Sequence, residues 1–299
     1  MRLWVSNSGV RVSGHLVRGF AVTIVGLGLT ACDSIEKLDL FGTEKYKPEI
    51  VPEVPAEQLY SEGLNRLQNK SYESANKKFG DVDKQHPYSP LAKKALVMSA
   101  YANYERGDYD EAISSAKRFL TLHPADPDAA YAQYIMAMSY YSQVPDVTRD
   151  QERVEKAALA LQELIDRYPS SEYVSDAKFR VTVVKDQLAA KEMDVGRYYL
   201  KRRNYTAAIN RFRQVVARFQ TTRHVEEALE RLTECYLALG VVGEAQTAAA
   251  VLGHNFPDSE WYKDAYALLS KGGLEPREDE GSWISRAFKG LTKTVGIRN

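Results

Sequence analysis

KSYESANKKFGDVDKQHPYSP (residues 70–90) and GDYDEAISSAKRFLTLHPADP (residues 107–127) repeat one pattern. Tyr72, Ala75 and Pro87 of the first stretch recur 37 positions later as tyrosine, alanine and proline of the second. The apolar residues between them are three or four positions apart, a spacing typical of one face of an α-helix. A proline disfavours the helical conformation in the residue before it. The two stretches therefore predict one repeated helix that a proline ends.

The same pattern occurs three more times towards the C-terminus. Its members are Ala157, Leu161, Leu164 and Pro169, then Tyr205, Ala208, Phe212 and Val215, and then Ala245, Ala249, Leu252 and Pro257. An earlier helix is expected to cross each copy at a small residue twelve positions before the alanine, which is Gly63, Ala100, Gly196 or Thr233. In the third copy the small residue is Ala137, twenty positions before Ala157. This predicts an eight-residue insertion in a loop around SQVPDVTRDQER (142–153).

These copies resemble tetratricopeptide repeats, helix–turn–helix units that stack because one unit cannot bury its apolar face alone. Five copies predict an all-α superhelix. Residues 171–204 contain no proline and keep helical apolar spacing, so we expect a long or kinked helix there. This helix would join an N-terminal half (56–172, repeats one to three) to a C-terminal half (173–271, repeats four and five with a cap).

The first 31 residues have the order of a secretory signal, with three arginines, an apolar run from Phe20 to Leu29 and two small residues. The run is shorter than the roughly 20 residues that span a bilayer. The stretch LTAC (29–32) resembles the lipobox of bacterial lipoproteins, whose cysteine is acylated and becomes the new N-terminus. We therefore expect a lipid anchor on Cys32 and a proline-containing flexible tether over 32–55. An ordinary signal followed by an incidental cysteine is the alternative.

Charge and motifs exclude several functions. The chain has 40 basic and 40 acidic residues, and removal of the signal leaves a small net negative charge, which gives no electrostatic basis for binding nucleic acid. After acylation only Cys235 remains, so no internal disulfide can form. The sequence contains no nucleophile elbow, zinc-protease motif or phosphate-binding glycine loop. We expect no catalytic residue, no metal and no cofactor other than the covalent lipid on Cys32.

A tyrosine-lined groove is expected in the N-terminal half, because the first helix of each repeat lines the concave surface of such a superhelix. The inward positions of repeats one to three hold Tyr60, Leu64, Tyr101, Tyr104, Tyr131, Tyr134 and Tyr141, with Val97 and Met138 between them. Tyrosine offers a large contact area with a polar tip at low entropy cost, which suits an extended or partly folded peptide. Packing between helices is the alternative for any single tyrosine.

The inward positions of repeats four and five differ in character. They hold Met193, Arg197 and Lys201, followed by Glu227, Glu230 and Glu234. This segregation of charge by sign predicts a second site, for a folded partner. Solvated helix surface is the alternative for each charge taken alone.

The block VVKDQLAAKEMDVGRYYLKRRNYTAAINRF (183–212), together with the lipobox, tether and repeats, resembles the BamD family of the outer-membrane β-barrel assembly (BAM) machinery. Its most specific matches are Lys185-Asp186, Leu188-Ala189, Glu192, Tyr198-Tyr199 and Asn210-Arg211. The resemblance implies a lipid-anchored scaffold on the periplasmic face of the outer membrane, beside other BAM lipoproteins. It also implies that the C-terminal repeats hold the barrel protein BamA through Arg197, Asn210 and Arg211. The N-terminal groove would receive the C-terminal targeting strand of unfolded outer-membrane β-barrel proteins.

Two features leave alternatives open. A cell-envelope tetratricopeptide adaptor lipoprotein, associated with Tol–Pal or peptidoglycan and without barrel clients, would share the repeats and the anchor. In the tail (272–299), Trp283, Ile284, Ala287, Phe288 and Leu291 fall on one helical face, with cations beside them. This short amphipathic helix could dock on a partner or a membrane surface, or fray in water.

Overall fold

The computed structural model describes residues 53–294, with side chains to residue 289. The described chain is all-helical, without strands, which confirms the predicted fold class. Its elements are α2 (Ala56–Gln68), α3 (Tyr72–Gln85), α4 (Pro90–Arg106), α5 (Tyr109–Leu122), α6 (Ala129–Ser142), α7 (Glu152–Arg167), α8 (Val174–Lys201), α9 (Tyr205–Arg218), α10 (Val225–Ala238), α11 (Val242–Asn255), α12 (Glu260–Lys271) and α13 (Trp283–Thr294).

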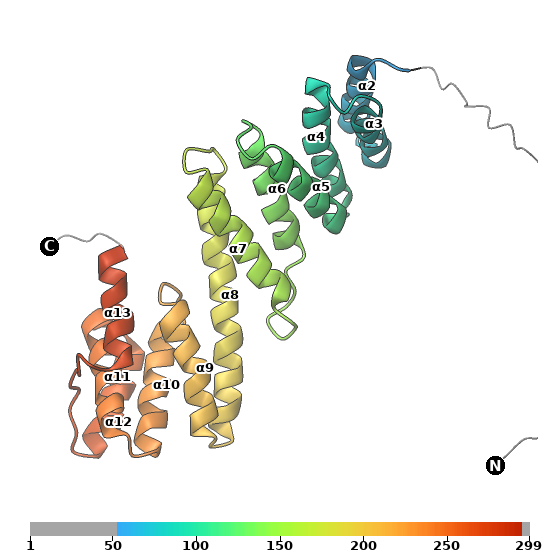
Figure 1. The fold of residues 1–299 in the computed structure, drawn as a ribbon. Coiled ribbons are helices and arrows are strands. Elements are labelled where there is room, and N and C mark those ends of the chain that lie inside the picture. Colours follow the sequence, from blue (N-terminus) through green and yellow to red (C-terminus); the bar gives the residue numbers. More distant parts are fainter. Residues whose placement is uncertain (1–52, 295–299) are drawn as a thin grey trace, which may run out of the picture. The chain divides into compact units, whose positions relative to one another are not determined.

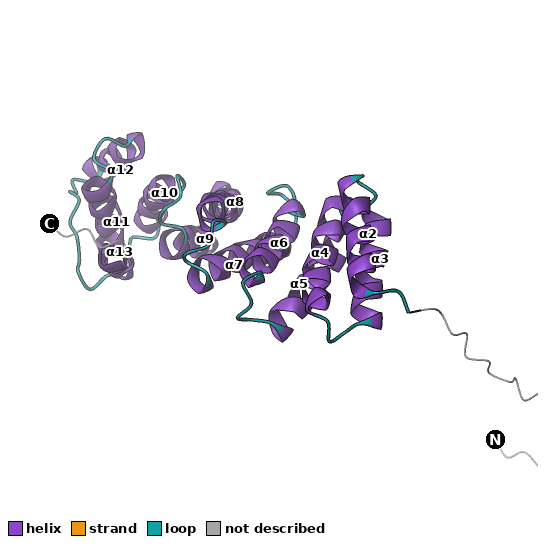
Figure 2. Cartoon of the chain, turned by 90° about the horizontal axis from the view of Figure 1, so that it is seen from above, coloured by secondary structure: helices purple, strands orange, loops and turns teal. Residues whose placement is uncertain are grey.

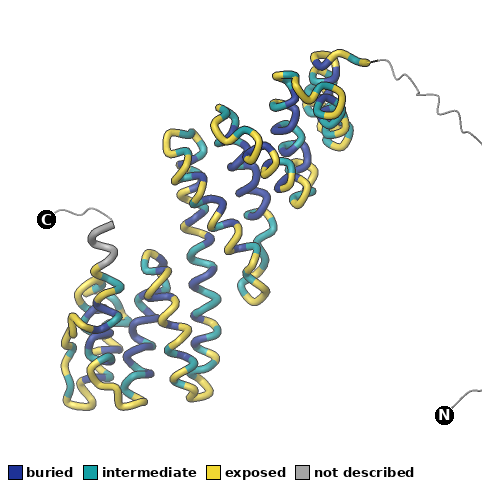
Figure 3. Tube along the Cα trace, viewed as in Figure 1, coloured by how far each residue is buried: buried dark blue, intermediate teal, exposed yellow. Residues whose placement is uncertain are grey.

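The helices stack in chain order as antiparallel pairs (Figures 1 and 2). The pairs α2–α3, α4–α5, α6–α7, α8–α9 and α10–α11 coincide with the segments that the repeat pattern predicts. Buried positions follow the sides on which neighbouring helices face each other, while turns are exposed (Figure 3). Each helix therefore depends on its neighbours for burial of its apolar face.

The turns within the pairs depend on left-handed backbone. Gly107 and Gly240 adopt φ values of 88° and 72°, which glycine tolerates without a steric penalty. Lys70 and Arg203 adopt φ values of 57° at the corresponding places in two other pairs. The third pair has no such turn, because the predicted insertion forms the loop between α6 and α7.

The two helices of a pair cross where the sequence places a small residue. A Cβ atom added at Gly63 would lie 2.6 Å from the ring of Phe79, and one at Gly196 would lie 2.4 Å from the ring of Phe212. Ala100 crosses a helix that carries Ala116 at the position of these rings, and both alanines are fully buried. Glycine therefore occurs where the facing residue is a phenylalanine.

The long helix predicted between the halves is confirmed as α8, which has 28 residues. Its N-terminal part packs on α7 and its C-terminal part pairs with α9. Val184 and Leu188 are buried as the apolar spacing predicts. The apolar spacing of this segment also predicts burial of Phe179 and Val183, but both are exposed, because they lie on the opposite side of the helix from its buried residues.

Candidate functional site

Four tyrosine rings form a continuous half-buried surface across α4, α6 and the start of α8. The ring centroids of Tyr101 and Tyr131 are 6.3 Å apart, and those of Tyr131 and Tyr173 are 5.4 Å apart. Tyr134 stacks on Tyr173 at 4.7 Å. We call Tyr101, Tyr131, Tyr134 and Tyr173 the tyrosine cluster. It connects three successive helix pairs through side chains that keep part of their surface in solvent.

An ion pair of α8 lies beside the tyrosine cluster. The hydroxyl of Tyr134 donates a hydrogen bond to the Asp176 carboxylate at 2.8 Å, and the Nε of Arg180 donates to the same carboxylate oxygen. The Arg180 guanidinium also lies 4.8 Å from the ring centroid of Tyr141, a cation–π contact. Tyr141 is thereby connected to the tyrosine cluster through Arg180 and Asp176.

The titration of these groups reflects burial and pairing. Burial, with the hydrogen bond to Asp176, raises the pKa of Tyr134 to about 12. Burial likewise raises the pKa of Tyr131. Burial opposes ionisation of Asp176, but hydrogen bonds from Arg180 and Tyr134 lower its pKa below the usual value. At neutral pH the surface therefore presents neutral phenols beside a charged arginine–aspartate pair.

The remaining predicted groove residues do not join the tyrosine cluster through ring contacts. Tyr60 packs on Phe79 at 5.6 Å, and Leu64 packs on the small core around that ring. Tyr104 contacts Tyr109 of its own pair at 5.9 Å. Val97 and Met138, expected between the tyrosines, are buried in the helix stack instead and do not line the surface.

Sequence reasoning missed Tyr173, Asp176 and Arg180. The inward positions of repeat four were counted from Gly196, which left the N-terminal turns of α8 without an assignment. The spacing of these three residues, three and then four positions, places them on one face at the start of the helix. That spacing is the signal that could have found them.

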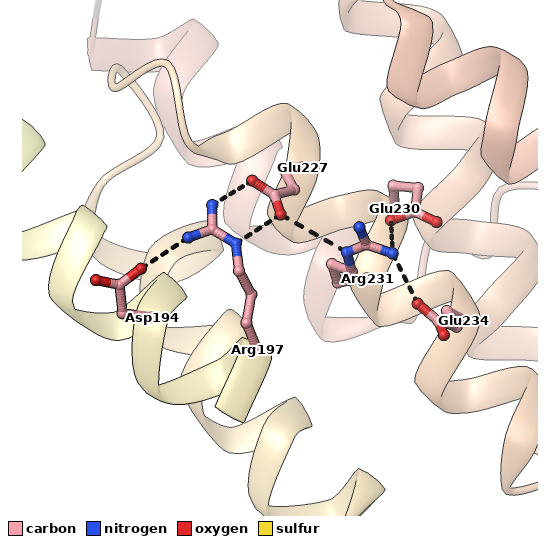
Figure 4. A network of polar contacts seen from close by, with 6 residues as sticks. All are labelled: Asp194, Arg197, Glu227, Glu230, Arg231 and Glu234. Carbon is pink, nitrogen blue, oxygen red and sulfur yellow. Dashed lines mark hydrogen bonds and ion pairs between the residues drawn. The ribbon is translucent and has the colours of Figure 1, made fainter. Parts of the chain in front are cut away.

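Charged side chains connect α8 to α10 in the C-terminal half (Figure 4). The Nε of Arg197 donates to the Glu227 carboxylate at 2.8 Å, and its Nη1 donates to Asp194 at 2.8 Å. Arg231 lies 3.6 Å from Glu227 and 3.3 Å from Glu230, and it donates to Glu234 at 2.9 Å. We call these six residues the α8–α10 charge network.

This network corrects the expectation of an exposed, charge-segregated face. Met193 is fully buried, and Glu227 and Glu230 are also buried. The opposite charges on the two helices face each other, so they pair within the chain. Lys201 is exposed at the end of α8.

Burial and pairing shift the pKa values of two acids of the network in opposite directions. Burial opposes ionisation of Glu227, but hydrogen bonds and charge from Arg197 and Arg231 lower its pKa. Burial raises the pKa of Glu230 to about 7, although Arg231 opposes the change. Glu230 is therefore the acid of this network that is most costly to ionise.

Asn210 and Arg211 lie on the exposed side of α9, in a shallow hollow that Glu192, Tyr199 and Gln214 also line. The Arg211 guanidinium lies 3.3 Å from the Glu192 carboxylate, and its side chain is 44% exposed. Arg197 belongs to the charge network instead and does not line this hollow. Residues from three of the specific sequence matches, Glu192, Tyr199 and Asn210-Arg211, thus meet at one place.

The C-terminal tail docks on the chain itself. Helix α13 packs against α9 and α11. Ile284 is fully buried, and the indole nitrogen of Trp283 donates to the Tyr236 hydroxyl at 3.1 Å. Of the alternatives for this segment, the structure shows a helix in which Ile284 is buried and Trp283 and Phe288 pack against the core of the same chain. Cys32 and most of the tether lie outside the described residues.

Known proteins resemble this chain over most of its length. A family model described as an outer membrane lipoprotein matches residues 52–252. The chain is 47% identical over 231 residues to the outer membrane protein assembly factor BamD of Caulobacter vibrioides, with 77% of this chain and 76% of that protein covered. The chain belongs to the BamD family. The BamD of Rickettsia prowazekii is 40% identical over 83% of this chain and 95% of its own length. The BamD of Neisseria meningitidis serogroup A is 32% identical, with 81% and 92% covered.

The residues that the family model matches include the tyrosine cluster, the charge network and the α9 hollow. The matched residues end within α11, so α12 and α13 lie beyond the family model. Among the helices that the structure describes, none is long and apolar enough to cross a membrane.

Proposed function

We propose that this protein is a non-catalytic scaffold of outer-membrane β-barrel assembly. Its relatives are named as outer membrane protein assembly factors. In the proposal, an acyl chain on Cys32 holds it at the periplasmic face of the outer membrane, and the helix stack binds BamA, other BAM lipoproteins and unfolded client proteins. Stacked helix pairs suit this role, because they offer extended surfaces to more than one partner.

The N-terminal half, together with the start of α8, is the proposed receptor for clients. The observation that carries this assignment is the half-exposed tyrosine cluster, a continuous aromatic surface that extends over α4, α6 and the start of α8. The targeting strand of a barrel protein ends in an aromatic residue, which can stack on such rings. The strand would lie extended across α4, α6 and the start of α8.

Crosslinking tests the client site. The double variant Tyr101→Ala and Tyr131→Ala should reduce photo-crosslinking of C-terminal barrel peptides severalfold, because each truncation removes an aromatic contact of the tyrosine cluster on the order of 1 kcal/mol. Tyr266→Ala, which removes an exposed tyrosine of α12, is the matched control and should leave crosslinking unchanged. Equal crosslinking in the double variant and the parent protein would reject the client site.

The C-terminal half is the proposed BamA interface. Arg211 and Asn210 supply exposed donors in the α9 hollow, whereas Arg197 would act by holding α8 against α10. Arg211→Glu should release BamA from detergent-solubilised complexes while the helical circular dichroism spectrum stays the same. Arg153→Glu, at an exposed arginine of α7, is the control. Retention of BamA by Arg211→Glu would contradict the interface.

Affinity purification of the lipidated protein from solubilised envelopes tests the role as a whole. Recovery of BamA is the expected result. Recovery of Tol–Pal or peptidoglycan-associated proteins without BamA would instead establish the envelope-adaptor alternative.

A further inference from the structure

Arg180 brings a positive charge to one end of an otherwise acidic tyrosine surface. Glu105 raises the pKa of Tyr101 and Glu172 raises that of Tyr173, in both cases after burial as the larger cause. The negative charge of Asp128 also raises the pKa of Tyr173. An arginine beside these acids therefore distinguishes the α8 end of the cluster from the rest.

The Arg180 side chain is held in place with part of its guanidinium unused. Its Nε is bonded to Asp176, which also accepts from Tyr134, and its plane lies near the ring of Tyr141. Within the described residues, its terminal nitrogens make no hydrogen bond, and the side chain is 25% exposed. A preorganised guanidinium with free donors can bind a carboxylate in a defined geometry.

We propose that Arg180 binds the C-terminal carboxylate of a client strand, while the terminal aromatic side chain packs on Tyr134, Tyr141 and Tyr173. This inference rests on the proposed client function of the tyrosine cluster and gives the bound strand a direction. The chain end lies at α8, and the preceding residues extend towards Tyr101 of α4. Glu105, beside Tyr101, then favours basic or neutral side chains upstream and disfavours acidic ones.

The test compares two forms of one short peptide that ends in phenylalanine, with either a free C-terminal carboxylate or a C-terminal amide. Binding to the purified mature protein is measured by fluorescence anisotropy. The free acid should bind about tenfold more tightly than the amide, as expected for one charge-assisted hydrogen-bonded contact. Arg180→Gln should remove this preference by weakening binding of the acid alone.

Two further variants distinguish the contact between Arg180 and the peptide carboxylate from the general effect of removing a positive charge. Arg180→Lys keeps the charge without the planar fork and should retain part of the preference. Arg118→Gln removes an exposed arginine that pairs with Asp83 between α3 and α5, and it should leave the preference intact. Thermal unfolding of each variant checks that the stack is folded.

The possible failures are distinguishable. If both peptides bind and Arg180→Gln keeps the tenfold preference, or the parent protein shows none, the role of Arg180 is wrong while the client groove stands. If neither peptide binds the parent protein, or if both bind but Tyr131→Ala leaves their affinity unchanged, the client groove itself is wrong. Loss of the preference in Arg180→Gln with its partial retention in Arg180→Lys would establish the carboxylate contact.

Discussion

Gly196 occupies a place where the backbone of α8 meets the ring of Phe212. A Cβ atom there would lie 2.4 Å from the ring, closer than side-chain atoms normally approach. We expect Gly196→Ala to lower the free energy of unfolding by about 1–3 kcal/mol, the usual cost of overpacking a core. Urea unfolding of the mature protein measures the change.

Gly80 is the matched control for this prediction. It also lies within a helix, α3, but a Cβ atom there would have no neighbour within 4 Å. Gly80→Ala should therefore stabilise the protein by up to about 1 kcal/mol, because alanine favours the helix. A gain in stability from Gly196→Ala would contradict the packing account.

Glu230 should make stability depend on pH. Its pKa is raised from an ordinary 4.5 to about 7, so the folded state binds this proton more tightly than the unfolded state. The free energy of unfolding therefore falls as the pH rises from about 4.5 to about 7. Because a tenfold difference in proton affinity corresponds to about 1.4 kcal/mol, the whole effect is on the order of 3 kcal/mol.

Glu230→Gln tests this by removing the ionisation. The variant should be more stable than the parent protein at pH 8 and close to it at pH 5, by urea unfolding at both values. Glu234→Gln removes a charge beside the same arginine from a side chain that is 36% exposed, and it should not reproduce this difference. A Glu230→Gln variant that is less stable than the parent at pH 8 would show that the charged form is required.

Among the elements, α13 illustrates how a short helix gains order from its contacts. Twelve residues are marginal as an isolated helix in water. Here Ile284 is fully buried, and the Trp283 ring lies 4.8 Å from the Arg213 guanidinium. Docking on α9 and α11 therefore accounts for the helix.

Ile284→Ala should release α13 locally. Loss of a buried isoleucine costs about 2–5 kcal/mol, which is enough to undock a peripheral helix. Limited proteolysis should then cut after residue 272 much faster than in the parent protein, while α2–α11 stay resistant. Arg286→Ala, an exposed position on the same helix, should leave the cleavage rate unchanged. Equal cleavage rates in Ile284→Ala and the parent protein would contradict the docking.

The sequence predicts the regular elements because their signals are local. The spacing of Ala75, Phe79 and Val82 is enough to place α3, and the proline after it marks its end. The repeat pattern did not predict the role of the start of α8, since the extra N-terminal turns of this helix have no counterpart in the other pairs. Glu227 and Glu230 were also misassigned, because a charged helix face has the same spacing whether it meets solvent or a neighbouring arginine.

Across the part of the chain that the structure describes, most buried apolar residues fall into two clusters of unequal size. The smaller contains residues of α2, α3 and α4, with Phe79 in it. The larger extends from α4 to α13 and includes Phe212. In a stack where each repeat contacts only its neighbours, stability is a sum of local terms. The first helix pair should therefore open without the rest of the molecule.

Phe79→Ala and Phe212→Ala test this independence by hydrogen exchange. Each removes a fully buried ring, at a cost of about 3–5 kcal/mol. Phe79→Ala should reduce protection in α2 and α3 and leave α9–α11 as in the parent protein. Phe212→Ala should reduce protection in α8 and α9 while α2 and α3 keep theirs. If Phe79→Ala lowered protection equally from α2 to α11, the stack would unfold as one cooperative whole. The tyrosine cluster and the α9 helix both pack against the larger cluster, so the separate cores predict that opening of α2 and α3 alone leaves the proposed client and BamA surfaces in place.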